Sequence, residues 1–522
     1  MNAMTKQPSR TSASTQFDQT KLDEAGTQLR ELLGIPFSGE QLAAITAPLQ
    51  PNVIIAGAGS GKTTVMAARV VWLVASGQIR PDQVLGLTFT RKAAAELSDR
   101  VAAALQQAGV VDRFGADDAG EQLIMTYDAF AGRLVSDHGL RIGAESDRRL
   151  ITGATRFRLA GQVVAQASGP FQYLTRLRPS SLTERVLYLD EQLSQHLISD
   201  AELIDWTDAF AAELAQAPSY RGKPYAQVRN AIAVAGERLE LLELVGDYRA
   251  AKQEAGVLEF HDQMAIAAQL AERVPQVGWA MREQFRVVLL DEYQDTSAAQ
   301  ARLLRALFGA GVDPSGMGHA VTAVGDPHQA IYGWRGASPS NILRFRTDFP
   351  TAAGQPAQLY RLSVNRRSDR TIIDLANRLA QPLRADSRLQ QATADHASAS
   401  EPAGGHDDLL QAADGKAAGT VQVAAFETWP QEVAWLANEV AASHDRADPP
   451  QWSQIAVLVR RNADIGLIYQ ELTARDVPVE IVGLDGLLNL PGIIDVVDTL
   501  RLIADVLSLI HISEPTRLLS IS

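Results

Sequence analysis

The segment AGAGSGKT (56–63) combines glycines with a lysine and a threonine in an order that suits phosphate chemistry. It nearly matches the pattern G-x-x-x-x-G-K-[ST], although Ala56 takes the place of the first glycine. Glycines let backbone N–H groups close around phosphate oxygens, while Lys62 can reach the β- and γ-phosphates and the Thr63 hydroxyl can bind Mg²⁺. The predicted nucleotide-binding residues of this segment are Ala58, Gly59, Ser60, Gly61, Lys62, Thr63 and Thr64. The alternative is a glycine-rich turn before a structural helix.

The segment VVLLDEYQDTS (287–297) places two carboxylates directly after an apolar run that has the pattern of a buried strand. In open α/β sheets, ligands bind at the carboxyl ends of the strands. We therefore predict that Asp291 binds Mg²⁺ and that Glu292 is the general base that orients an attacking water. The alternative is an acidic cap of the following helix.

The segment VGDPHQAIYGWRGAS (324–338) brings an amide (Gln329), two aromatic rings (Tyr332 and Trp334) and an arginine (Arg335) into a few positions. Aromatic side chains stack on nucleic-acid bases of any sequence, which contributes about 1–3 kcal/mol per base. The segment therefore predicts a polar sensor beside a stacking platform. A buried cation–π pair of Trp334 and Arg335 is the alternative.

Composition sets wide bounds on the protein. The chain has 522 residues, a net charge of −13 and no cysteine. Its length predicts about three structural units. The lack of cysteine excludes disulfides, thiolate metal sites and cysteine nucleophiles. The net charge argues against a surface covered with basic side chains, but not against a basic groove. The polar N-terminus shows no secretory signal, and no run of about 18 apolar residues occurs, so we expect a cytoplasmic protein that does not cross a membrane.

Strand patterns alternate with helical patterns around these segments, which predicts a doubly wound α/β core. The segments TVQVAAF and QIAVLVR are predicted strands that resume the alternation after a low-complexity stretch. The last residues, LSLIHISEPTRLLSIS, have an unrelated texture, similar to translated sequencing-adapter sequence. The predicted parts are a flexible N-terminus (1–35), the two parts of the first core (36–130 and 251–350), a helical insertion (131–250), a partial second core (351–506) with a disordered insertion at about 384–419, and a non-native tail (507–522).

Five segments occur in the order that is typical of one family: AGAGSGKT, TFTRKAAAEL, DEYQDTS, GDPHQAIYGWRGAS and LSVNRRSD. Together they resemble the UvrD/Rep/PcrA-like superfamily 1 DNA helicases, over roughly residues 36–505. The resemblance implies a RecA-like P-loop NTPase core with a helical inserted subdomain and a partial second RecA-like core. It also implies that ATP binds between the two cores and that single-stranded DNA crosses them.

The resemblance assigns roles to further residues. It implies that Gln41 recognises the adenine edge, that Gln329 senses the γ-phosphate and that Arg367 is an arginine finger. The residues that match DNA-contacting positions of the family are Phe89, Thr90, Tyr127, Tyr332, Trp334 and Arg335. Purely structural roles remain open as alternatives, since Tyr127 and Phe89 could be core residues and Arg367 could be a surface charge.

The chain departs from the family pattern at several positions. Thr64 stands where an arginine is common, Arg91 replaces an asparagine, and Arg366 stands where a tyrosine usually stacks on the adenine. These departures, with the segment VGLDGLLNLPGIIDVVDTLRLI, favour the actinobacterial AdnAB-like helicase–nuclease branch, which has RecB-like features. We predict that His261, in LEFHDQM, is structural rather than a metal ligand.

Two family motifs that follow the strands of the second core are missing, and no nuclease carboxylate–lysine signature is visible. The sequence therefore predicts an N-terminal fragment of a longer motor, one that binds ATP weakly and unwinds DNA poorly.

The predicted function is that of an ATP- and Mg²⁺-dependent 3′–5′ helicase or translocase in DNA repair or recombination. Its expected partner is single-stranded and partially duplex DNA, with a second helicase–nuclease subunit as a further candidate. The alternative is a non-catalytic, helicase-like DNA-binding subunit of a helicase–nuclease complex. Another kind of P-loop ATPase is disfavoured by the aromatic–arginine segment.

Overall fold

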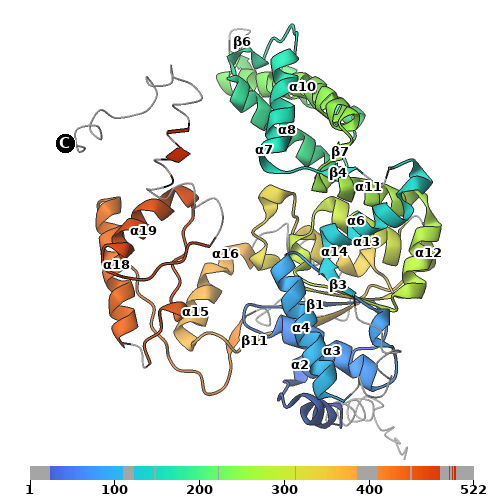
Figure 1. The fold of residues 1–522 in the computed structure, drawn as a ribbon, viewed down its shortest axis with the longest axis vertical. Coiled ribbons are helices and arrows are strands. Elements are labelled where there is room, and N and C mark those ends of the chain that lie inside the picture. The colour runs from blue at the N-terminus through green and yellow to red at the C-terminus, as the bar shows by residue number, and fades with distance from the viewer. Residues whose placement is uncertain are drawn as a thin grey trace, which may run out of the picture. The chain divides into compact units, whose positions relative to one another are not determined.

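The computed structural model describes residues 24–109, 123–145, 148–220, 223–311, 313–384, 409–446 and 449–482, with a few positions between 493 and 500. The chain divides into two compact units, Met1–Thr420 and Val421–Ser522 (Figure 1).

A parallel six-stranded sheet forms the centre of the first unit, with the strand order β10-β1-β9-β8-β2-β3. The strands are β1 (Asn52–Ala56), β2 (Val84–Thr88), β3 (Leu123–Thr126), β8 (Val287–Leu290), β9 (Ala320–Gly325) and β10 (Gln358–Leu362). Every residue of β2, β8 and β9 is buried, as expected for parallel strands that are covered on both faces. The predicted α/β fold is confirmed.

Helices cover both faces of this sheet (Figure 1). One face packs against α2 (Gly39–Ile45), α3 (Lys62–Ala75) and α4 (Arg91–Gln107); the other packs against α6 (Tyr127–His138), α11 (Phe260–Arg273), α12 (Pro275–Gln284), α13 (Ala298–Phe308) and α14 (Ser340–Asp348). Successive side chains of a strand point to opposite faces. Along β8, Val288 and Leu290 accordingly join one apolar cluster, whereas Val287 and Leu289 join the other.

Two predicted boundaries of this core were wrong. Strand β10 lies beside β1 in parallel register, with Ile55 opposite Arg361, so residues 358–362 belong to the first sheet and not to a second core that begins at 351. Residues 24–33 are helical, as the pattern LDEAGTQLRELLG predicts, and Leu29 is fully buried against the core, so the flexible N-terminus predicted at 1–35 extends too far. Strand β10 gains its place by pairing with β1, a contact that local sequence does not reveal.

The helical insertion is a group of helices (Figure 1) with an apolar core of its own. It contains α7 (Gly153–Gln166), α8 (Pro179–His196), α9 (Asp200–Ala215) and α10 (Ala226–Glu254). A short parallel pair, β4 (Arg149–Leu150) and β7 (Val257–Leu258), brings its two ends side by side. The insertion therefore starts later than the predicted residue 131, because Phe130 and Leu134 of α6 pack into the core beneath the sheet.

A buried ionic cluster joins the insertion to α11. The Lys252 ammonium lies 2.7 Å from Asp190, 3.1 Å from Glu259 and 2.7 Å from Asp262, which come from α8 and the start of α11. His261 Nε2 lies 3.5–3.6 Å from the same three carboxylates. Asp190, His261 and Asp262 are close enough to hold a metal ion, but the lysine already supplies the compensating cation.

The second unit contains α18 (Trp429–Arg446) and α19 (Ile465–Thr473), which pack through Val433, Ala437 and Leu472. The segments TVQVAAF and QIAVLVR were predicted to be strands, but neither is a strand in the part of the chain that the structure describes. Ile455 and Val457 pack against the helices, whereas Leu458 is 94% exposed. Alternating apolar side chains can satisfy such packing without the backbone ladder that defines a strand.

The predicted disordered insertion is partly ordered. Strand β12 (Gln411–Ala412) pairs in parallel with β11 (Val364–Asn365), and the N–H groups of Arg370 and Thr371 donate to carbonyls at 417 and 418. Residues 385–408 lie outside the described part of the chain. The disordered insertion predicted from low sequence complexity therefore extends too far at its C-terminal end. Among the described residues, no helix is long and apolar enough to cross a bilayer.

We expect Lys252→Met to lower the free energy of unfolding by about 3–5 kcal/mol, because three buried carboxylates would lose their shared cation. Chemical denaturation measures this change. Lys92→Met is the matched control, since Lys92 is largely exposed and its pair with Glu96 is 3.9 Å long. Equal stabilities of the two variants would contradict the prediction.

The same cluster predicts a loss of stability in acid. Burial alone would raise the pKa of Asp190, but the His261 imidazole and the Lys252 ammonium hold this pKa well below its usual range. A carboxylate with a depressed pKa stabilises the fold above its unfolded pKa of about 3.9, and this contribution is lost as pH falls through the folded value. Denaturation of Asp190→Asn between pH 7 and pH 3 should show a weaker pH dependence below about pH 4 than the parent.

Candidate nucleotide and nucleic-acid site

The glycine-rich loop lies between β1 and α3, as predicted. Gly59 and Gly61 have φ values of +68° and +87°, which favour glycine because a side chain would clash with the backbone. The N–H groups of Lys62, Thr63 and Thr64 form the first turn of a helix and have no intrahelical acceptor. This helix end is therefore a ready anion site.

The predicted carboxylates meet the loop lysine. Lys62 Nζ lies 2.9 Å from Glu292 Oε2. Glu292 adopts a left-handed backbone (φ +46°), a strained conformation for this residue that clusters at functional sites. Asp291 is buried beside it and accepts the Glu292 N–H at 3.1 Å. Burial, and then the Glu292 carboxylate, raises the pKa of Asp291 to about 6 despite the opposing charge of Lys62.

The site suits a divalent cation in its charge and in its donor atoms. Two adjacent carboxylates, Asp291 and Glu292, lie here, and Lys62 is ion-paired with Glu292. The pKa of Asp291 is raised first by its burial and then by the neighbouring Glu292 carboxylate. Carboxylate and hydroxyl oxygens, such as those of Asp291 and Thr63, are ligands that Mg²⁺ prefers.

Gln41 lies against the loop, but its amide is engaged by protein groups. Its Nε2 donates to the Ser60 carbonyl at 2.9 Å, and its Oε1 accepts from Ser38 N and from Arg366, both at 3.0 Å. Arg366, which replaces the tyrosine that is common in the family, thus holds Gln41. Recognition of adenine by Gln41 stays a prediction.

Arg367 lies against the loop as well. The Arg367 Cβ lies close to Gly59: if Gly59 carried a side chain, its Cβ would be only 2.8 Å from the Arg367 Cβ. Asn365, which was not among the predicted site residues, sets this position: its Nδ2 donates to the Ala58 carbonyl at 2.6 Å and its Oδ1 accepts from Arg367 N at 2.8 Å. Its place directly before two arginines, at the end of β11, is a signal that could have identified it.

Arg69 is a second residue that sequence reasoning missed. Its fully buried guanidinium donates to the carbonyls of Ala44, Ile45 and Ala47 and to the Thr322 hydroxyl on β9. These bonds tie the C-terminal end of α2 and the residues just after it to α3, the helix that follows the phosphate loop. An arginine on an otherwise apolar helix face was the available signal.

Four of the predicted DNA-binding residues come together. The Phe89 and Tyr332 rings are 4.6 Å apart, the Tyr332 and Trp334 rings are 6.3 Å apart, and the Arg335 guanidinium lies 4.6 Å from the Trp334 ring. Trp334 is 64% exposed, so the alternative of a buried cation–π pair was wrong. We call Phe89, Tyr332, Trp334 and Arg335 the aromatic platform.

The remaining predicted residues lie around this platform. Thr90 is exposed, and its hydroxyl caps α4 by accepting from Ala93 N at 3.1 Å. Gln329 is half-buried and donates to Asp326 Oδ2 at 2.6 Å. Tyr127 does not join the platform. It is 3% exposed within the core, and its hydroxyl donates to the Asp291 carbonyl at 3.1 Å. Because a buried ring cannot stack on a base, its assignment as a DNA contact was wrong.

We expect Tyr127→Phe to leave the affinity for single-stranded DNA unchanged and to lower stability by about 1 kcal/mol, because only a buried hydrogen bond is lost. Fluorescence anisotropy with a labelled oligonucleotide and chemical denaturation measure the two quantities. A clear loss of DNA affinity in a variant of near-parental stability would restore Tyr127 as a contact.

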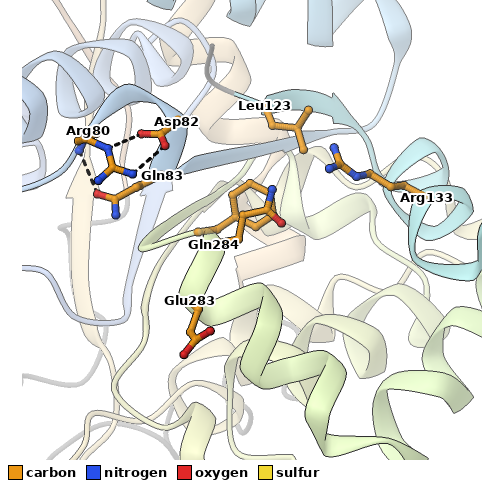
Figure 2. A pocket seen from close by; sticks show the side chains of 8 residues that line it. Arg80, Asp82, Gln83, Leu123, Arg133, Glu283 and Gln284 are labelled. Atoms are coloured by element: carbon orange, nitrogen blue, oxygen red, sulfur yellow. Dashed lines mark hydrogen bonds and ion pairs between the residues drawn. The ribbon is translucent and has the colours of Figure 1, made fainter. Parts of the chain in front are cut away.

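A cavity of about 380 Å³ lies at the other edge of the sheet (Figure 2). Its lining residues are Arg80, Asp82, Gln83, Leu123, Arg133, Glu283, Gln284 and Phe285. Gln83, Leu123 and Phe285 stand at or just before the amino ends of β2, β3 and β8. Arg80 is paired with Asp82 at 2.8 Å, as the dashed lines show. The cavity is therefore separate from the phosphate loop, which lies at the carboxyl ends of the strands.

Comparison with known proteins agrees with this geometry. The family model described as the UvrD/REP helicase N-terminal domain matches residues 37–350, and the UvrD-like helicase C-terminal domain matches residues 360–514. The chain belongs to the UvrD/REP helicase family. Both the predicted family and its α/β helicase fold are thereby confirmed.

Relatives of this UvrD/REP family member include three bacterial helicases. The chain is 30% identical to ATP-dependent DNA helicase UvrD1 of Mycobacterium leprae over 342 residues, which are 65% of this chain and 38% of the relative. It is 29% identical to ATP-dependent DNA helicase UvrD2 of Mycobacterium tuberculosis over 86% of this chain and 55% of the relative. It is 27% identical to DNA helicase II of Escherichia coli over 89% of this chain and 54% of the relative.

The chain thus spans about half, or less, of the length of the UvrD/REP relatives that it matches. These relatives do not support the AdnAB-like subfamily or a second helicase–nuclease subunit. The C-terminal family model extends to residue 514, past the point at 507 where a non-native tail was predicted, and so does not support that prediction.

Proposed function

We propose that this chain carries the nucleotide- and DNA-binding core of an ATP-dependent DNA helicase or translocase that acts in DNA repair. The observation that carries the proposal is the pairing of Lys62 with Glu292 at the carboxyl edge of a sheet whose next loop presents an exposed aromatic platform. Family membership and the helicase activity for which the relatives are named support it.

The proposed chemistry begins with an exchange of partners at Lys62. Incoming β- and γ-phosphates compete with Glu292 for the ammonium group, since both are anions within its reach. Once Lys62 turns to the phosphates, the Glu292 carboxylate is free to orient a water for in-line attack. Mg²⁺, held by Asp291 and Thr63, would neutralise charge on the phosphate oxygens. Arg367, beside the loop, would stabilise the charge that develops on the transferred phosphoryl group.

The aromatic platform would bind single-stranded DNA without regard to sequence, because every base offers a face on which an aromatic ring can stack. Arg335 adds a positive charge next to Trp334, which suits a phosphate or a base face. A motor that steps along DNA requires such indifference to sequence. We further propose the 3′–5′ direction of movement, which rests on the family resemblance alone; translocation that displaces a label at the 3′ end and not at the 5′ end would contradict it.

The test is ATPase activity of the natural full-length protein with and without single-stranded DNA. We expect DNA to stimulate hydrolysis, and Lys62→Ala and Glu292→Gln to lower hydrolysis by about 100-fold or more, because each removes a group that acts on the phosphates or the water. Trp334→Ala should reduce the DNA-stimulated rate much more than the basal rate, since the loss of stacking weakens DNA binding by about 1–3 kcal/mol. DNA binding without any ATP turnover in the parent would contradict the motor and favour an accessory subunit.

A further inference from the structure

Gln294 occupies the space between the catalytic carboxylate and the loop that leads to the aromatic platform. Its side chain is 1% exposed, and both ends of its amide are used. Nε2 donates to Glu292 Oε2 at 2.8 Å and to Asp295 Oδ2 at 3.1 Å, while Oε1 accepts from Asp326 N at 3.0 Å. Gly325 leaves room for it, because a Cβ there would lie 2.1 Å from Gln294 Oε1.

One end of the Gln294 amide binds the carboxylate that pairs with the loop lysine. The oxygen that accepts from Gln294 is Glu292 Oε2, the same atom that pairs with Lys62. A nucleotide that draws Lys62 away therefore removes one of the two donors to the oxygen that Gln294 binds. Because Gln294 Nε2 donates directly to this oxygen, the loss of Lys62 acts on the Gln294 amide without an intervening group.

The other end holds the segment that precedes the platform. Gln294 binds the Asp326 N–H, and the Asp326 carboxylate accepts from His328 N and from Gln329 Nε2. The adjacent Asp295 accepts from Ile331 N at 3.3 Å. Consecutive residues, 294 and 295, thus hold both ends of the loop at 326–331, and the next residue is Tyr332 of the platform.

We infer that Gln294 is a positioning residue that transmits the state of Glu292 to the aromatic platform, so that bound nucleotide changes the grip on DNA. The inference rests on the proposed function and adds a component to it. A glutamine is required because the side chain must donate to two carboxylates and also accept from a backbone N–H. A shorter amide would not reach all three partners. Glutamate would place a third carboxylate beside Glu292 and Asp295, whereas methionine fills a similar volume without hydrogen bonds.

The experiment compares the affinity of the chain for fluorescein-labelled oligothymidylate with and without a non-hydrolysable ATP analogue and Mg²⁺. In the parent, we expect the analogue to change DNA affinity by about fivefold or more. In Gln294→Met this ratio should fall to within about twofold of unity, while affinity for the analogue itself stays within about threefold of the parent. A purely structural role would instead weaken analogue binding and DNA binding together. Gln284→Met, at the amino edge of the sheet, is the matched control and should keep the parental ratio.

Each outcome decides the question. A parental ratio in folded Gln294→Met overturns the inference, and so does a parent that binds DNA with no response to the analogue. A parent that does not bind DNA overturns the proposed function itself. Should Gln294→Met fail to fold, Gln294→Asn and Gly325→Ala are read by the same ratio, because the first shortens the amide and the second displaces it. Both must lose the response if the inference holds.

Discussion

The ion pair between Lys62 and Glu292 is the interaction around which the site is arranged. It joins the first residue of α3, after the phosphate loop, to a residue 230 positions later that follows β8. In the sheet a single strand, β9, lies between β1 and β8. Parallel strands end at one edge, so the loops after β1, β8 and β9 lie together there. The pair also neutralises a carboxylate whose backbone is strained and whose neighbour, Asp291, is buried. The glycine-rich loop and the two carboxylates are thereby kept next to each other.

A second constraint is that the loops at this edge are held by side chains that are themselves buried. Arg69 donates to carbonyls at the end of α2 and just after it, Asn365 fixes the turn that carries Arg367, and Gln294 ties the Glu292 carboxylate to the loop after β9. Each bond satisfies a polar group that burial would otherwise leave unpaired, which is costly in a low-dielectric interior. The helical insertion follows the same rule, since Lys252 neutralises the carboxylates where the insertion meets α11.

Local signals predicted which segments lie together better than they predicted the boundaries of the parts. The loop, the two carboxylates and the aromatic–arginine segment have types and spacings that few other structures require, and the structure brings them to one edge. By contrast, α6 has an amphipathic pattern that would suit either the insertion or the core, and only its contacts place it in the core. The segment after Leu409 has low complexity, yet β12 finds a partner in β11 because a hydrogen-bonded neighbour is available.

The sequence by itself determined the parallel α/β core, the glycine-rich loop before α3, the two carboxylates that follow β8 and the family, since all of these depend on residue types at short spacing. Tertiary structure alone decided which aromatic rings are free to stack. Tyr127 and Trp334 both matched DNA-contacting positions, yet one is buried against the Asp291 carbonyl and the other is largely exposed. It also revealed Gln294, whose partners come from segments that are distant along the chain. The physical reason is that exposure and hydrogen-bond partners are set by the packing of distant segments, which local spacing does not encode.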